Sequence, residues 1–210
     1  MPRKTRIKRV NKVSDLILLD KNVQHVEVDG RSFSRHINIG GSTVGGFVEK
    51  TAKVDETAYI GSKALVFDKA EVIGNAMVYG DARVFGDALV FDKAQISGNA
   101  QVSGKARVHD NAWISGNAQI SDNAQVHGDA QVFGDARVFG DARVCDKAQI
   151  SGDARVFGKV LVSGKAKIHQ GIISIDYCFT LTEQVKEYLK SVENLKTRLN
   201  TIGAKSVLRK

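Results

Sequence analysis

The chain has 210 residues, of which 42% are apolar and only 7% aromatic, so its core should consist of small aliphatic side chains. Its net charge of +8 is uneven: residues 1–51 carry 10 basic and 5 acidic groups, residues 52–171 carry 14 of each, and residues 172–210 carry 7 and 4. The apolar run at residues 16–19 is too short for a signal peptide or a membrane span, and two cysteines make no disulfide framework, so we expect a cytoplasmic protein outside the membrane.

Residues 1–12 form a basic tail without an acidic residue. Its basic residues are Arg3, Lys4, Arg6, Lys8, Arg9 and Lys12. Such a cluster suits contacts with the phosphates of a nucleic acid or with another polyanion. It is also typical of a solvated tail, and neither stacking aromatic residues nor a groove-reading motif accompanies the charge. Both interpretations stay open.

Residues 13–51 form an N-terminal region that we expect to cap a repeat array. Residues 23–28 and 32–39 alternate in polarity around Asp29-Gly30, which predicts a β-hairpin. The glycine-rich stretch at 40–46 lacks the Gly-Lys-Ser/Thr ending of a phosphate loop, so we interpret it as a turn into the repeats.

Residues 52–171 consist of twenty consecutive hexads of the form A-x-V-x-G-D, without one insertion. The first position is Ala in nineteen hexads, with Val160 as the exception, and the third is Val or Ile in all twenty. Alternate side chains of a strand share one face, so positions 1 and 3 should point inward and positions 2 and 4 outward. Position 5 is Gly in twelve hexads and Asp in five, which predicts a bend.

Three bends close a triangle, so each coil should span three hexads and stack on the next at about 4.8 Å. Twenty hexads then make about 6.7 coils, a prism roughly 32 Å long. We therefore predict an all-β fold, a parallel β-helix of about 6–7 triangular coils over residues 52–175, with an N-terminal hairpin cap and a C-terminal α-helix.

The uninterrupted hexads are similar to those of the left-handed hexapeptide-repeat superfamily. The variant with glycine two places after the aliphatic residue, as in residues 82–87, and the stretch Gly45-Gly46-Phe47-Val48 resemble the YdcK-like hexapeptide-repeat proteins of bacteria and their phages. The resemblance implies a left-handed coil. Members of the superfamily include acyltransferases, but a fold alone does not imply an activity.

Residues 176–210 contain the predicted C-terminal helix and a basic tail. From Thr182 to Gly203 the apolar residues recur at alternating spacings of three and four. They are Val185, Tyr188, Val192, Leu195, Leu199 and Ile202. This spacing predicts either a short dimeric or trimeric coiled coil or a helix that covers the open end of the prism.

The period of three hexads sorts the outward side chains into columns, and one column at position 4 contains His109, His127 and Cys145 on consecutive coils. Imidazole and thiolate are zinc ligands, so these three residues are metal candidates. The resemblance to acyltransferases makes His109 or His127 a candidate general base, with acyl-CoA as the cofactor. The alternative is that they are ordinary solvent-facing residues of a column that elsewhere holds Phe and Ser. The resemblance also implies that an acyltransferase would interrupt its coils with a loop that helps to build a cofactor slot, and these repeats contain no such loop.

A second column at position 4 contains two pairs of phenylalanines around a polar middle, Phe67, Phe85, Phe139 and Phe157. An apolar stripe of this kind favours a protein interface, although ring stacking along the prism would also explain it. Tyr79, Trp113 and Phe133 add aromatic surface to the remaining wall.

Three functions compete. The leading hypothesis is a non-enzymatic scaffold that binds a protein partner or assembles with itself as a dimer or trimer. One form of that role is a binding protein directed at a host or a phage. The alternatives are an acyltransferase that uses acyl-CoA and a nucleic-acid or polyanion binder that acts through residues 1–12.

Overall fold

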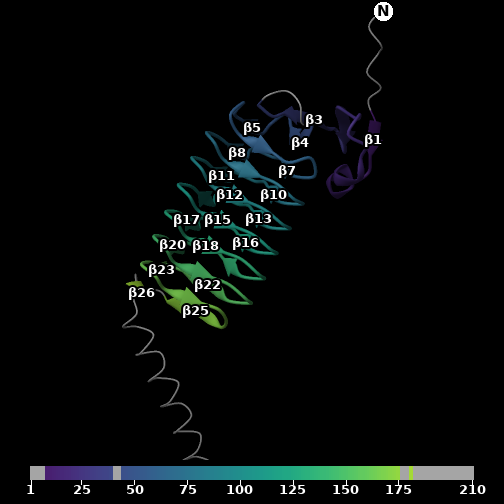
Figure 1. Ribbon diagram of the computed structural model, residues 1–210. Coiled ribbons are helices and arrows are strands. Elements are labelled where there is room, and N and C mark those ends of the chain that lie inside the picture. The colour runs from purple at the N-terminus through teal and green to yellow at the C-terminus, as the bar shows by residue number, and fades with distance from the viewer. Residues whose placement is uncertain (1–7, 40–43, 176–179, 182–210) are drawn as a thin grey trace, which may run out of the picture.

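The computed structural model describes residues 8–39, 44–175 and 180–181. Within these residues the chain winds into a parallel β-solenoid of about seven turns, as the hexads predicted (Figure 1). In the solenoid each strand pairs in parallel with the third strand that follows it, so that Gln101, for example, lies beside Gln119. The predicted coil of three hexads is therefore confirmed.

Three sheets form the walls of the prism. Sheet A contains β1 (Lys8–Val10), β2 (His25–Val28), β3 (Arg31–Ile37), β4 (Val44–Glu49), β7 (Leu65–Val66), β10 (Arg83–Val84), β13 (Gln101–Val102), β16 (Gln119–Ile120), β19 (Arg137–Val138), β22 (Arg155–Gly158) and β25 (Ile172–Ile175). Sheet B contains β5 (Lys53–Val54), β8 (Glu71–Val72), β11 (Leu89–Val90), β14 (Arg107–Val108), β17 (Gln125–Val126), β20 (Arg143–Val144), β23 (Leu161–Val162) and β26 (Thr180–Leu181). Sheet C contains β6 (Tyr59–Ile60), β9 (Met77–Val78), β12 (Gln95–Ile96), β15 (Trp113–Ile114), β18 (Gln131–Val132), β21 (Gln149–Ile150) and β24 (Lys167–Ile168).

The core of the solenoid consists of the first and third positions of the hexads. From Ala58 to Val162 these side chains are at most 1% exposed, and they form one continuous cluster along the axis. Alanine fills the crowded corners and Val or Ile fills the walls, so the interior is packed with small aliphatic groups. The inward face predicted from the alternation is confirmed.

Position 5 supplies the bends. All twelve glycines there, and the five aspartates, have a positive φ, such as 67° at Gly116 and 59° at Asp110. Glycine adopts this conformation without a steric penalty, and Asp tolerates it better than most residues. The Asp carboxylates also accept hydrogen bonds from the next coil, for example from the Gly140 amide to Asp122 Oδ2 at 3.0 Å. The corners are thus tied together along the axis.

The N-terminal region adds a layer to sheet A. Strands β2 and β3 form an antiparallel hairpin around Asp29 and Gly30. Strand β3 also pairs antiparallel with β4, and β4 pairs in parallel with β7 of the solenoid. The sequence predicted this hairpin but not β1, which pairs with β2, nor the 3-10 helix η1 (Val13–Leu18). The capping role of the hairpin stays a prediction.

Two arginines fasten this layer to the solenoid. The Arg31 guanidinium binds Glu49 and donates to Asp68 Oδ1 at 2.7 Å. Arg35 is only 8% exposed and lies 4.0 Å from the centroid of the Phe47 ring. Its guanidinium donates to five backbone carbonyls, those of Leu19, Asp20, Val23, Gly45 and Ser62.

Residues 182–210, which include the predicted C-terminal helix, lie outside the described residues. Among the residues that are described, no helix is long and apolar enough to cross a membrane.

Candidate functional site

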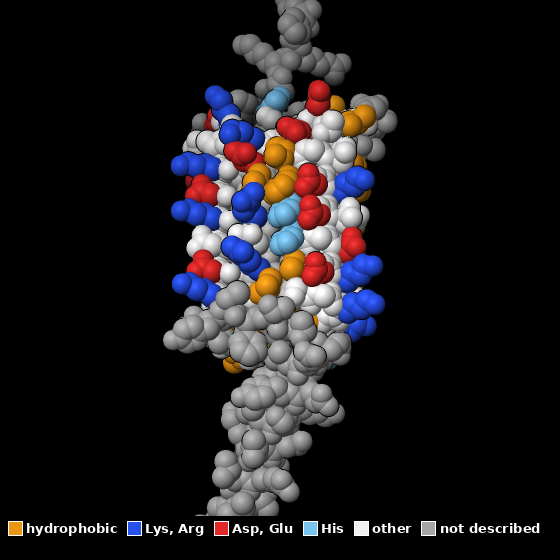
Figure 2. All heavy atoms as spheres, turned by 90° about the vertical axis from the view of Figure 1, so that its left-hand side faces the viewer, with side chains coloured by type: hydrophobic (Ala, Val, Ile, Leu, Met, Phe, Trp, Pro, Cys, Tyr) orange, Lys and Arg blue, Asp and Glu red, His pale blue; other side chains and the backbone are white. Residues whose placement is uncertain are grey.

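The densest cluster of reactive side chains lies on sheet B, where the histidine column predicted from the sequence runs along the axis. Phe91, His109 and His127 stack on consecutive coils, with ring centroids 4.5 and 4.9 Å apart. Figure 2 shows two neighbouring histidines in the middle of one face, with apolar side chains above and below them, basic side chains on one side and acidic ones on the other. The register of the coils brings these residues together as expected.

Asp110 connects the two histidines. Its carboxylate lies 3.3 Å from His109 Nδ1 through Oδ1 and 3.8 Å from His127 Nδ1 through Oδ2. Asp110 is a corner residue with a φ of 59°, and Oδ2 also accepts the Gly128 amide at 2.9 Å. One carboxylate therefore orients a corner and faces both imidazoles. The hexad pattern predicts Asp110 only as a bend residue, so this contact was not expected from the sequence.

The charges around the column shift its pKa values. The pKa of Asp110 is lowered, chiefly by the hydrogen bond from the Gly128 amide and further by the two histidines. Partial burial lowers the pKa of His127, and the positive charge that His109 and Arg143 can carry lowers it further, against the opposite effect of Asp110 and Asp146. His127 is thus favoured in the neutral form, in which one ring nitrogen can accept a proton.

Cys145 continues the column next to His127, but its thiol is poorly accessible and is not favoured as the thiolate that binds a metal. Its side chain is buried, with 8% exposure, and burial raises the pKa of its thiol. The sequence predicted an outward position that faces solvent. Side chains at position 4 are less accessible to solvent than expected, because residues of adjacent coils are spaced at about 4.8 Å and cover each other.

The stacking geometry limits how the histidines could hold a metal. A zinc ion lies about 2.0–2.1 Å from each imidazole nitrogen, so two ligating nitrogens are at most about 4.2 Å apart. The two rings are parallel to within 1° with centroids 4.9 Å apart, so the nitrogen lone pairs of the two rings lie in separate parallel planes. In the described conformation the atoms close enough to share an ion belong instead to Asp92, His109 and Asp110. Joint binding by His109, His127 and Cys145 stays a prediction that needs rotated side chains.

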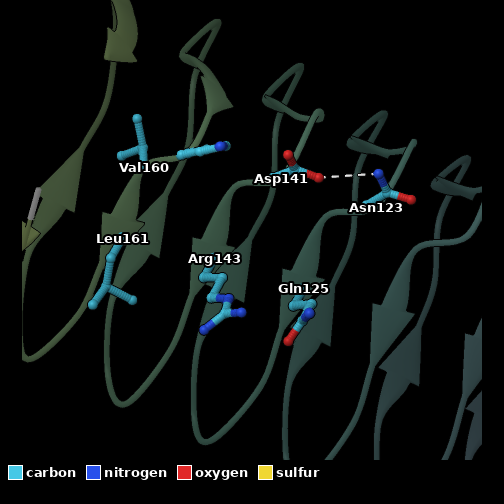
Figure 3. A pocket seen from close by; sticks show the side chains of 7 residues that line it. Asn123, Gln125, Asp141, Arg143, Val160 and Leu161 are labelled. Carbon is cyan, nitrogen blue, oxygen red and sulfur yellow. Dashed lines mark hydrogen bonds between the residues drawn. The ribbon is translucent and has the colours of Figure 1, made fainter. Parts of the chain in front are cut away.

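Two hollows lie at the corners beside this wall. One, of about 400 Å³, is lined by residues of three successive coils that include Asn123, Gln125, Asp141 and Arg143 (Figure 3). Asn123 Nδ2 donates to Asp141 Oδ1 at 3.0 Å along one side of it. The other hollow, of about 450 Å³, includes Gly128, Asp146 and Lys147. Neither set of lining residues contains His109 or His127.

The four phenylalanines predicted to form an interface lie on sheet A as two stacked pairs. The ring centroids of Phe67 and Phe85 are 4.9 Å apart, and those of Phe139 and Phe157 are 4.7 Å apart. All four are half-buried, and the Arg31 guanidinium covers the Phe67 ring at 5.4 Å. Ring stacking along the solenoid therefore accounts for part of their burial, and their role as an interface stays a prediction.

Several other predicted site residues cannot be placed. Arg3, Lys4 and Arg6 lie outside the described residues, as do the C-terminal residues Val185, Tyr188, Val192, Leu195 and Leu199. The backbone of Lys8 and Arg9 belongs to β1, and Lys12 is exposed. Polyanion binding through residues 1–12 stays a prediction.

The fold and the repeats define the class of protein. This chain is a parallel β-solenoid built from hexapeptide repeats. Three of its segments, residues 94–110, 130–146 and 148–164, match the family described as YdcK Beta solenoid repeat. The fold and these matched repeats thus support a hexapeptide-repeat β-solenoid that is similar to the YdcK-like proteins. None of the curated proteins matches the chain.

Proposed function

We propose that this protein is a non-enzymatic scaffold whose flat walls bind another protein or further copies of itself. The observation that carries the proposal is the unbroken stack. From Lys53 to Ile168 each strand pairs with its counterpart on the neighbouring coil, and in this described part no loop leaves the stack between coils. Such a body is stiff, and its outward side chains form straight columns that present a preordered surface to a partner.

The wall of phenylalanines is one surface on which this can be tested. Phe85→Asp combined with Phe139→Asp places charge on both ring pairs of sheet A, and we expect it to reduce assembly or partner binding through that wall. Gln125→Asp, at an outward position of sheet B, is the control because it places a charge on another wall. Solution mass by light scattering and capture of copurifying protein are the readouts. A protein that is monomeric at every concentration and retains no partner would contradict the scaffold proposal.

An acyltransferase is the second candidate, favoured by the contact of Asp110 with both histidines. In this role a neutral histidine removes the proton from an acceptor hydroxyl or amine, which attacks the thioester carbonyl of acyl-CoA and displaces the CoA thiolate. Calorimetry with acetyl-CoA tests it, with His127→Ala as the comparison. Absence of binding at millimolar acetyl-CoA would dismiss this candidate.

A further inference from the structure

Sheet C differs from the other two walls because its outward face is uncharged over six coils. The outward residues of β6 to β21 and of the positions that follow them are Tyr59, Gly61, Met77, Tyr79, Gln95, Ser97, Trp113, Ser115, Gln131, Phe133, Gln149 and Ser151. By contrast, sheet A carries Arg83, Arg137 and Arg155 at the corresponding positions. Sheet B carries Glu71, Arg107 and Arg143.

This wall also carries the most accessible aromatic side chains of the described solenoid. Tyr59 is 37% exposed and Trp113, the only tryptophan of the chain, is 39% exposed. Interface cores are depleted in charged residues and enriched in aromatic residues and Met, and the wall has this composition. A partner for it should therefore be flat and uncharged as well.

Two large rings, Tyr79 and Phe133, stand among small side chains along position 4 of the wall. From the first coil to the last the column is Gly61, Tyr79, Ser97, Ser115, Phe133, Ser151 and His169. The serines next to the rings are recessed, since Ser97 is 7% and Ser151 8% exposed. The rings of Tyr79 and Phe133 thus stand beside low positions on the same face.

When the position-4 column is placed against the same column of a second copy running in the opposite direction, large side chains face small ones. Sheet C has seven described strands, and β15 is the middle one. Consider a twofold axis that lies in the interface, directly above β15 and parallel to its strand direction. This axis would place β12 opposite β18 and β9 opposite β21 of a second copy. Tyr79 then faces Ser151, and Phe133 faces Ser97, so each ring meets a recess. At position 2, Gln95 faces Gln131 and Trp113 faces its own counterpart.

We infer that sheet C is a self-association surface through which two copies of this chain pack antiparallel, related by a twofold axis at β15. The inference rests on the proposed scaffold function and names a second copy as the partner. A C2 interface must be self-complementary, and position 4 of this wall meets that condition because each ring faces a serine, while no like charges are brought together.

The size of the wall sets the expected affinity. Seven strands at about 4.8 Å and a side of about five residues give a projected area of roughly 500 Å², and side-chain relief raises the accessible area above this. Stable interfaces start at about 600 Å² per partner. This area is at the low end for stable interfaces, so we expect a weak dimer whose mass depends on protein concentration.

In the proposed dimer Gln95 of one copy lies opposite Gln131 of the other. Substitutions at these two positions therefore test both the interface and the alignment of the two copies. Gln95→Lys with Gln131→Lys places like charges opposite each other twice in the dimer, and we expect dimerisation to weaken by about tenfold or more. Gln95→Lys with Gln131→Glu places opposite charges there, and we expect the dimer to be retained or tightened. The two variants share Gln95→Lys, and they differ only in the sign of the charge introduced at position 131.

Gln119→Lys with Gln125→Lys is the matched control, because it adds two lysines on sheets A and B and should leave the mass unchanged. The readout is sedimentation of the full chain over a concentration series, with thermal unfolding as a check on folding. Trp113→Lys, a single change at the exposed centre of the wall, gives a second disrupting variant.

The two proposals fail differently. A monomer at all concentrations, or a dimer in which the Lys/Lys and Lys/Glu variants behave alike, overturns the inference about sheet C. A dimer that only the Phe85 and Phe139 substitutions dissociate also overturns it, but supports the scaffold function through sheet A. The scaffold function itself fails only if neither a second copy nor another protein binds.

Discussion

The imidazole rings of His109 and His127 lie parallel, 4.9 Å apart between centroids, with the Asp110 carboxylate facing Nδ1 of both. Partial burial disfavours the charged form of His127, and the Asp110 carboxylate offsets only part of this effect on its pKa. Protonation of His127 should therefore act against the folded state.

This relationship predicts a pH dependence of stability. Burial lowers the pKa of His127 below its ordinary value of 6.5, so the unfolded chain binds a proton more readily than the folded chain. The contribution of neutral His127 to the free energy of unfolding is fully present above about pH 6.5 and is lost as the pH falls below that value. His127→Gln should reduce this slope in urea unfolding measured between about pH 7 and 5.

His36 contributes to the same slope, because burial lowers its pKa by more than the contact of its Nε2 with the Ala58 carbonyl at 3.1 Å raises it. The His127 variant should therefore flatten the profile in part, and a variant that also carries His36→Gln should flatten it further. A single-variant profile parallel to that of the unchanged protein would contradict the role assigned to His127.

The corners predict a difference between two glycines of equal φ. Gly116 and Gly164 both have a φ of 67°. A Cβ on Gly116 would lie 2.9 Å from the Gly134 amide nitrogen, whereas a Cβ on Gly164 would meet no atom of a described residue within 4 Å. Gly164→Ala should cost about 1–2 kcal/mol for the left-handed backbone alone, and Gly116→Ala should cost clearly more. Equal losses in urea unfolding would show that close packing of the coils is not responsible.

The N-terminal layer should depend on Arg35. Arg35→Met removes the donor for five carbonyl groups and should destabilise this layer by about 3–5 kcal/mol. Arg155→Met, at an exposed position of sheet A, is the control. Limited proteolysis should cut the Arg35 variant within residues 8–50 before the solenoid is cut. Cleavage at the same rate in both variants would be inconsistent with this anchoring role.

Cys145 should react slowly with thiol reagents. Burial and the nearby Asp146 carboxylate raise the pKa of its thiol, so little thiolate is present at neutral pH. In a Cys178→Ser background, labelling with an aromatic disulfide should be slow in the folded protein and fast in denaturant. Fast labelling without denaturant would mean that the thiol is accessible and would strengthen the case for a metal ligand.

The sequence was sufficient to predict the solenoid, because the same hexad is repeated twenty times and each inward position is restricted to a small aliphatic side chain. The histidine column and the phenylalanine pairs followed from the same period. Asp110 was missed because its contact with His109 depends on how a residue with positive φ aims its carboxylate. Arg35 was missed because its acceptors come from separate segments that share no period.

The constant step of three hexads between paired strands, for example from Gln101 to Gln119, has a consequence for the lengths that such a chain can adopt. Deleting three consecutive hexads would remove one coil and leave every later outward residue on its original wall. Deleting a single hexad would leave the interior equally well filled, yet it would turn all later columns by a third of a revolution. The histidines, the phenylalanines and the uncharged face would then each be split between two sides of the prism. Length variants of this protein should therefore tolerate whole coils and lose their surfaces with single hexads.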